Sequence, residues 1–565
     1  MLRSVTLALL AMFFAEAPAP AQTFKAGFAK VDISPEEPVR LSGYAGRDKP
    51  MEGADVPIYV RAVAVQHGDG PPHLLLGVES IGFPGTLSKA VFEALPEPVR
   101  SDRALFVMAS THSHTAPHVA TGLSNLYFVP QSAQEAAATE RYTALLQAKC
   151  IEAAKQALAD LKPARLTVSE GEVGFAKNRR RPQTGVWKDI GASKEGPADH
   201  AVPVVRISDP ATSKTRGLLF NYACHCTTFG PDHNRLNGDW AGYAMANLEA
   251  AEPGVVAICT VGCGADANPL QRTGPMQLEF AMQQGKALSD EVAKVSKAGR
   301  EITAAPKATF GYAGLPIDRP TIPDLEKNLK DASHPVRAHA ETMIATHQRM
   351  GRLPETYPMP IQAWRFGDEL TMVFLGGEVV VDYALRIKQE LGAPAKFQRA
   401  DLKPVDPPLP PTKGPVWVTA YANDVFGYVA SERVRSEGGY EVDTSMIYYL
   451  QPGRWSTGTE EVVMRRLHEL LRNSTSDRSL SLDEALKTFT VGDGLELSVV
   501  AAEPLISDPV NMAVGPDGRL WVVQMGDYPR GLDDHGQPGG KVVVLTDKDG
   551  DGRYDQSQVL SLIHI

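Results

Sequence analysis

Residues 104–118 read ALFVMASTHSHTAPH, an apolar run that leads into two histidines, His112 and His114. The run predicts a buried strand that ends close to the histidine pair. Side chains alternate along a strand, so both imidazoles are expected to point the same way, out of the carboxyl end of a sheet. Open α/β sheets place their functional sites there. Two imidazoles at such an edge suit zinc, or one metal ligand and one acid/base partner.

The same arrangement recurs along the chain. Apolar runs that predict strands precede polar or metal-competent residues: 217–224 precedes His225, 255–260 the Gly-rich loop 261–269, 370–375 Glu378, and 416–421 Tyr428. Helical segments are expected between them, at 136–161, 241–250 and 276–295. This alternation predicts an α/β metallohydrolase domain with a mixed sheet and a site at the strand carboxyl ends.

The composition is that of an ordinary globular protein. The chain has 565 residues, of which 43% are hydrophobic and 22% charged, and its formal net charge is -10 at pH 7. These values exclude a mostly disordered or polytopic membrane chain, and the acidic balance argues against a nucleic-acid binder. Five cysteines are too few and too odd in number for a disulfide scaffold. Without C-x2-C pairs a structural zinc at Cys224 and Cys226 is disfavoured, so we expect buried thiols.

Residues 1–21 predict a secretory signal peptide. Arg3 precedes a short apolar core, Val5 to Phe14, and small residues follow at Ala17 to Ala21. The alternative, an N-terminal membrane anchor, is disfavoured because the apolar core is too short to span a bilayer stably. The protein is therefore expected to be exported, to the periplasm, the cell surface or the medium.

The chain changes character after a polar linker at 472–480. Between 481 and 559, short strands are expected at 495–501, 510–514, 519–524 and 541–546. Four short strands separated by turns predict one blade of a truncated β-propeller. This part resembles the opening of the propeller in bacterial membrane-associated proteins of the sorbosone-dehydrogenase-like type. Residues 560–565 match the translation of a sequencing-library adapter, and we interpret them as an artefact.

An acidic loop in this C-terminal part has the spacing of a calcium site. Its carboxylates are Asp547, Asp549, Asp551 and Asp555, and carboxylate oxygens suit a hard cation such as Ca2+. The glutamate expected at the twelfth position of such a loop is Gln558 here. The alternative is an acidic turn between two strands.

A series of motifs between Lys25 and Leu471 resembles one known family. The blocks are KAGFAKVDISP (25–35), THSHTAPH (111–118), NRR (178–180), NYACHCTT (221–228), GDWAGYA (238–244), GCGADANP (262–269), GGE (376–378) and GYVASERVRSEGGYE (427–441). In this order they resemble the neutral/alkaline, non-lysosomal ceramidases, zinc-dependent amidases that cleave the N-acyl bond of ceramide. The resemblance implies a zinc hydrolase domain over 22–471, and the immunoglobulin-like domain of that family is not apparent.

The resemblance also implies a set of site residues. By motif, the zinc ligands are His112, His225, Glu378 and Tyr428. The implied catalytic residues are His114 as proton carrier, Tyr440 and Asn268 as oxyanion donors, and Arg179 as a substrate-binding group. The implied substrate is ceramide or another lipid or N-acyl amide, with peripheral contact to a membrane surface and no nucleic acid.

One block departs from the family pattern. Family members have a serine in Gly-Asp-Val-Ser-Pro, whereas this chain has Asn268 in the segment 265–269. An amide N–H can donate to an oxyanion, but it cannot act as a nucleophile or pass on a proton. The departure leaves open that the substrate is another N-acyl amide or an ester. A further alternative is a non-catalytic secreted binding protein with a degenerate hydrolase domain, against which the intact ligand set argues.

Several site residues also have a structural interpretation. His225 could be a core histidine between two thiols, and Glu378 could favour a helix N-terminus. Asp239 could cap the following helix or support the site. The other members of this group are Tyr428 and Tyr440, which could be packing aromatics, and His118 and His200, which are expected to be structural.

Overall fold

The computed structural model of the chain describes residues 24–180, 196–393, 399–400, 402, 404–410 and 412–472, and the C-terminal part from 482 to 562 with gaps. The predicted signal peptide, most of the predicted linker and residues 563–565 lie outside the described residues. Among the residues described, no helix has both the length and the apolar character that a membrane crossing requires.

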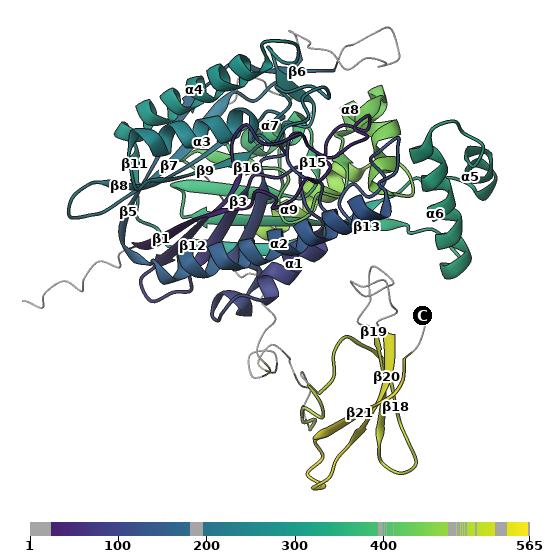
Figure 1. Ribbon diagram of the computed structural model, residues 1–565. Coiled ribbons are helices and arrows are strands. Elements are labelled where there is room, and N and C mark those ends of the chain that lie inside the picture. The colour runs from purple at the N-terminus through teal and green to yellow at the C-terminus, as the bar shows by residue number, and fades with distance from the viewer. Residues whose placement is uncertain are drawn as a thin grey trace, which may run out of the picture.

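A nine-stranded mixed sheet forms the centre of the main body (Figure 1), in the order β4-β3-β2-β1-β5-β7-β8-β9 with β11 paired to β5. Its strands are β1 (Phe24–Asp32), β2 (Tyr59–His67), β3 (His73–Val78), β4 (Phe106–Ser110), β5 (Lys162–Glu172), β7 (Ala201–Ser208), β8 (Thr215–Tyr222), β9 (Val256–Val261) and β11 (Arg300–Ile302). The β3–β4 and β8–β9 pairs are parallel, whereas β1–β2 and β7–β8 are antiparallel. The predicted mixed α/β fold is therefore confirmed.

A second sheet and two short strand pairs complete the framework. The sheet has the order β12 (Pro306–Pro316), β13 (Thr356–Phe366), β14 (Leu370–Leu375) and β16 (Val416–Thr419). The short pairs are β6 (Ala176–Asn178) with β10 (Ala267–Pro269), and β15 (Glu378–Val379) with β17 (Tyr428–Val429). The two larger sheets share a buried apolar core, to which Val107 and Ile258 contribute from the first sheet and Phe374 and Trp417 from the second.

The helices lie outside these sheets. They are α1 (Gly85–Glu93), α2 (Ala133–Ala159), α3 (Asp239–Ala251), α4 (Gln277–Val295), α5 (Ile322–Asn328), α6 (His334–Met350), α7 (Val381–Glu390), α8 (Glu432–Glu437) and α9 (Thr459–Arg472), with single turns η1 (Val99–Ser101), η2 (Arg103–Leu105), η3 (Ser296–Ala298), η4 (Tyr440–Thr444) and η5 (Ser445–Tyr449). The capping box of Ser132 and Glu135 explains why α2 begins where it does. In Figure 1, α3 and α4 run side by side over the sheet, where α3 contacts β9 and α4 contacts β5 and β7.

The C-terminal part forms an antiparallel sheet of β18 (Pro509–Val514), β19 (Leu520–Met525), β20 (Gly540–Thr546) and β21 (Gln556–Leu562). No propeller is seen in the described residues, which hold a single four-stranded sheet here, so the assignment of this sheet to a propeller blade stays a prediction. The strand expected at 495–501 does not form, and its Leu495 is 73% exposed. The fourth strand is instead β21, which pairs with β20 through the acidic turn and so needs only a local hairpin.

Candidate metal centre

Two strand ends bring the first histidines together. β4 ends at Ser110, and the following residues leave the sheet, because His112 adopts a left-handed backbone with φ 56°. Ser113 forms a parallel bridge with Cys226, which follows β8 in the same way. Both imidazoles of the His-x-His pair therefore reach one cluster, but through this turn after the strand and not through strand alternation.

His112 and His225 are each held from behind by a backbone carbonyl. Nδ1 of His112 lies 2.6 Å from the carbonyl oxygen of Ile81, and Nδ1 of His225 lies 2.7 Å from that of Gly264. A carbonyl only accepts, so both Nδ1 atoms carry a proton and both Nε2 atoms of the neutral rings present lone pairs. Metal-binding histidines are typically oriented in this way.

The lone pairs converge on a carboxylate. Oε2 of Glu378 lies 3.1 Å from Nε2 of His112 and 3.3 Å from Nε2 of His225. Nε2 of His114 lies 3.2 Å from Nε2 of His112, and one nitrogen from each of the three rings falls within 4.8 Å of the others. All of these side chains come from loops or short pairs at the ends of strands.

This donor set fits a divalent cation. Oε2 of Glu378 is buried and has no hydrogen-bond donor among the described residues. A positive charge between the carboxylate and the rings must come from a second ring proton or from a metal ion. Burial and the neighbouring Arg179 lower the pKa of His225 to about 4, so at neutral pH that ring holds no second proton. Imidazole nitrogens with a carboxylate are the ligands that zinc prefers.

The other oxygen of Glu378 has a partner that the sequence did not suggest. The hydroxyl of Tyr449, the last residue of η5, donates to Oε1 of Glu378. Burial and the charge of Glu378 raise the pKa of Tyr449, so its hydroxyl keeps its proton.

Tyr428 and Arg179 approach the cluster together. The Tyr428 hydroxyl lies 3.4 Å from Nε2 of His225 and accepts a hydrogen bond of 3.1 Å from Nη2 of Arg179. Nε of Arg179 donates to Oε1 of Glu441 at 2.9 Å, and Arg180 donates to the other oxygen of Glu441. The guanidinium of Arg179 is thus bound to protein groups and orients the Tyr428 phenol.

The remaining predicted residues lie around this centre. The Tyr440 ring packs edge-on against Tyr428, with centroids 5.4 Å apart. Asn268 is buried in β10, and its Oδ1 accepts a 3.2 Å hydrogen bond from Thr227 Oγ1. This leaves the Nδ2 group of Asn268 as its donor.

Asp239 supports the site from the start of α3. Its carboxylate accepts hydrogen bonds from the backbone amides of Thr228 and Trp240. The Trp240 indole in turn donates to the carbonyl of His225 at 3.0 Å, so Asp239 supports the site through this helix start.

Other predictions concern residues outside the cluster. His118 lies 3.2 Å from the hydroxyl of Ser42, and His200 lies 2.9 Å from the carbonyl of Ala176, so neither reaches the metal centre. All five cysteines are free and buried, as the sequence predicts.

Sequence reasoning did not find three residues at the centre, namely Tyr449, Glu441 and Tyr421, whose ring stacks on His112 with centroids 4.3 Å apart. Glu441 had a signal, because it directly follows Tyr440 in the last motif and can balance the buried charges of the NRR block. The two tyrosines had none that distinguishes them from packing residues.

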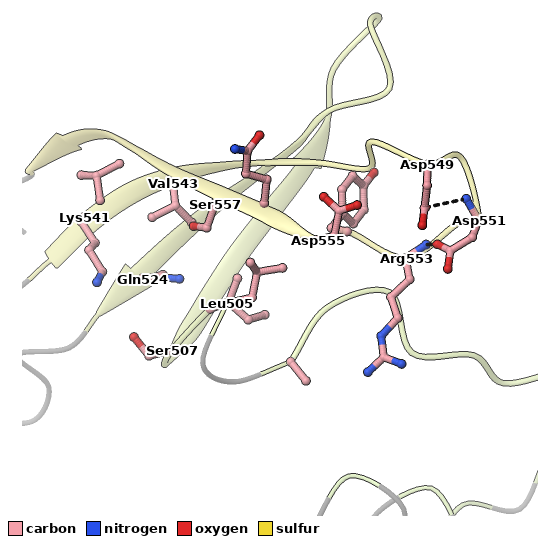
Figure 2. Close-up of a pocket in the computed structure, with 15 residues that line it drawn as sticks. Leu505, Ser507, Gln524, Lys541, Val543, Asp549, Asp551, Arg553, Asp555 and Ser557 are labelled. Atoms are coloured by element: carbon pink, nitrogen blue, oxygen red, sulfur yellow. Dashed lines mark hydrogen bonds between the residues drawn. The ribbon is translucent and has the colours of Figure 1, made fainter.

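The acidic loop of the C-terminal sheet is of a different kind (Figure 2). Carboxylate oxygens of Asp547, Asp549 and Asp551 lie within 4.8 Å of one another, but the last two side chains are exposed. Asp547 accepts from the amides of Gly550 and Gly552, at 2.7 and 2.9 Å. Asp555 stands outside this group. Figure 2 shows the loop at one end of a hollow of about 670 Å³. Calcium binding there stays a prediction.

Comparisons with known proteins agree with the fold. Residues 24–266 match the family model of the neutral/alkaline non-lysosomal ceramidases, N-terminal, and residues 481–561 match a domain of unknown function, DUF7133. The neutral ceramidase from Pseudomonas aeruginosa is similar in structure, at 16% identity and a TM-score of 0.58, over 96% of this chain and 89% of that chain. A ceramidase complexed with C2 is similar at 15% identity and a TM-score of 0.59, over 96% and 90% of the two chains. A search of the curated proteins gives no match.

Proposed function

We propose, from the match of residues 24–266 to the neutral/alkaline ceramidases, that this chain is a zinc-dependent amidase. Its substrate would be ceramide or a ceramide-like lipid, cleaved at the N-acyl bond to a fatty acid and an amine. The observation that carries the proposal is the convergence of the Nε2 atoms of His112 and His225 on Glu378 Oε2, an oxygen that has no donor among the described residues. A metal ion between these atoms would account for that arrangement.

The ligands would be His112, His225 and Glu378, with the Tyr428 phenol beside them. A zinc ion bound there supplies a water of lowered pKa and polarises the substrate carbonyl. The carbonyls of Ile81 and Gly264 keep both ligand rings in the tautomer that this requires.

His114 suits the role of proton carrier. Unlike the two ligand rings, it has no partner on its buried Nδ1 within the described residues, so no backbone carbonyl holds it in one tautomer. Burial and the neighbouring imidazoles of His112 and His225 lower its pKa well below the usual range, so the ring is neutral and can accept a proton. It would take the proton of the attacking water on Nε2 and give it to the departing amine nitrogen.

Donors for the oxyanion would come from two sides of the cluster. Tyr440 offers its hydroxyl, and Asn268 offers its Nδ2–H because its Oδ1 is taken by Thr227. Arg179 would act by holding Tyr428 and not by meeting the substrate directly, since its guanidinium is bound by Glu441 and Tyr428.

A second candidate keeps the metal hydrolase and changes the substrate to another N-acyl amide or an ester. Asn268 in place of the loop serine supports it, because an amide replaces a hydroxyl in the loop whose Gly264 carbonyl holds the His225 ring. The third candidate, a non-catalytic binding protein, is disfavoured, since the buried ligand set would have no role in it.

Fatty-acid release by the full chain tests these candidates. We would supply either ceramide in detergent micelles or a short N-acyl amine, with and without a zinc chelator. The variant His114→Gln serves as the inactive control. Chelator-sensitive cleavage of ceramide supports the proposal in full. Cleavage of the short amide alone supports the second candidate, and a zinc-loaded chain that cleaves neither supports the binding protein.

A further inference from the structure

Tyr449 connects the metal centre with a cavity of about 600 Å³. Its hydroxyl donates to Glu378 Oε1, and its ring lines the cavity together with Tyr357, Val425 and Phe426. No sequence motif marks this tyrosine, which lies nine residues beyond the motif tyrosine Tyr440.

The backbone around Tyr449 is fixed from several directions. The side-chain amide of Asn125 donates to the carbonyl of Ile447 at 3.0 Å, and its backbone N–H donates to that of Tyr448 at 3.2 Å. On the other side, the Gln451 carbonyl lies 2.7 Å from Nε2 of His339 in α6, and the Gln451 amide donates to the Phe426 carbonyl at 2.9 Å. The chain therefore delivers the Tyr449 ring to one place.

The Tyr449 side chain lines the cavity, so part of it faces open space, and its hydrogen bond to Glu378 holds the hydroxyl in place. The same bond fixes the carboxylate, because a carboxylate with Oε1 held by a donor can turn only Oε2 toward His112 and His225. Loss of the hydroxyl would leave Oε1 without this donor, and a charged oxygen that has lost its hydrogen bond favours rotation of the group.

We propose that Tyr449 is a positioning residue, which holds Glu378 in the orientation that binds the metal and thereby sets the metal affinity. The inference rests on the proposed function in that a metal is bound, but it does not depend on the substrate. Outer partners of metal ligands typically contribute about 10- to 100-fold to metal affinity.

Tyr357 provides a matched control. It is also half-buried, lines the same cavity, and donates its hydroxyl to a carboxylate, Oδ2 of Asp424, at 2.7 Å. Tyr449→Phe and Tyr357→Phe remove the same atom from the same kind of bond, and only the first of these bonds involves Glu378.

The experiment measures zinc affinity of the full chain by competition with a chromogenic chelator, without any activity assay. We expect Tyr449→Phe to weaken zinc binding about 10- to 100-fold and to change the visible spectrum of the Co2+-loaded protein, whereas Tyr357→Phe changes neither. In a Glu378→Gln background, Tyr449→Phe should cause no further loss, because the two residues act through one bond.

Equal losses for the two tyrosine variants, or full zinc affinity in Tyr449→Phe alongside a loss in Glu378→Gln, would overturn the inference while leaving the proposed function intact. A wild-type chain that binds no zinc would overturn both. If Tyr449→Phe does not fold, the double variant with Glu378→Gln must fold, since the stranded carboxylate is then gone. Failure of the double variant to fold would also overturn the inference.

Discussion

The chain gathers metal-competent side chains in two regions, and the regions differ in what their acceptor atoms already hold. In the main body, Glu378 Oε2 faces the Nε2 atoms of His112 and His225 with no donor among them. In the C-terminal sheet, the carboxylate of Asp547 already accepts two backbone amides of its own loop. Proximity of ligands is therefore a weaker sign of a metal site than acceptors that lack any donor.

The largest expected effect removes a ligand from the buried centre. His225→Ala should lower the zinc affinity of the full chain more than about 100-fold, because loss of an outer partner alone typically costs 10- to 100-fold. Amide hydrolysis should be lost with the metal. Zinc content after dialysis and fatty-acid release are the measurements.

Asp549→Asn is the matched change in the other region, and it should leave both zinc content and hydrolysis as in the wild type. Zinc retained in His225→Ala but lost in Asp549→Asn would reverse the comparison and contradict our assignment of the metal centre.

The next prediction separates the three histidines of the centre. His114→Gln should keep zinc within a few-fold of the wild type and lower the rate of hydrolysis about 10²- to 10⁴-fold, the usual contribution of a positioned acid/base group. The reason is that His114, unlike His112 and His225, has no carbonyl behind its Nδ1 within the described structure. Zinc titration and turnover are measured on the same sample. A loss of zinc as large as that in His225→Ala would make His114 a ligand.

The sequence predicted those parts of the site that lie next to a strand end. His112, His225 and Glu378 each follow an apolar run, so the local pattern made them candidates, and the resemblance to the ceramidases implied that they are ligands. Tyr449 lies 71 residues from Glu378 in the sequence, on a single turn, and no sequence pattern around Tyr449 indicates the contact between them. The left-handed turn at His112 was also missed, because a positive φ is uncommon for any residue other than glycine.

The C-terminal part shows the opposite error, a strand that the sequence predicted and that does not form. Residues 495–501 were expected to form a strand, but they form none: Leu495 and Leu497 are exposed, while Ala501 packs against the core of the sheet. Alternation states which residues can share a face, whereas strand formation also needs a neighbour with free backbone groups. β21 has that neighbour in β20, directly across the acidic turn.

A smaller effect is expected on the pH dependence of stability in the main body. Burial lowers the pKa of both His73 and His118 to about 4, below the ordinary histidine value of 6.5. As the pH falls, the two histidines take up protons in the unfolded chain before they do so in the folded chain, and this favours unfolding. The contribution of the two neutral rings to stability is therefore complete above pH 6.5 and is lost as the pH falls toward 4. At about 1.4 kcal/mol per pKa unit the loss is on the order of a few kcal/mol for each histidine.

Denaturant unfolding at several pH values between 7 and 4 measures this loss. His118→Phe should flatten the profile, and a zinc chelator in every sample keeps the metal ligands from contributing. A profile that stays as steep in His118→Phe would mean that this ring is not held neutral in the folded chain.

The smallest expected effect is calcium binding at the acidic loop. Each of Asp547, Asp549 and Asp551 accepts at least one backbone amide, so a cation must compete with bonds that the loop already has. Exposed sites of this kind have dissociation constants of about 10⁻⁴ to 10⁻³ M. At about 1 mM calcium, a dissociation constant of 1 mM would stabilise the fold by only about 0.4 kcal/mol. Calorimetric titration of the full chain, with Asp547→Asn as its match, measures it. Micromolar calcium affinity that disappears in Asp547→Asn would mean that the loop rearranges to release its carboxylates from the backbone amides. Acceptor oxygens that already hold a donor would then no longer distinguish the acidic loop from the buried centre.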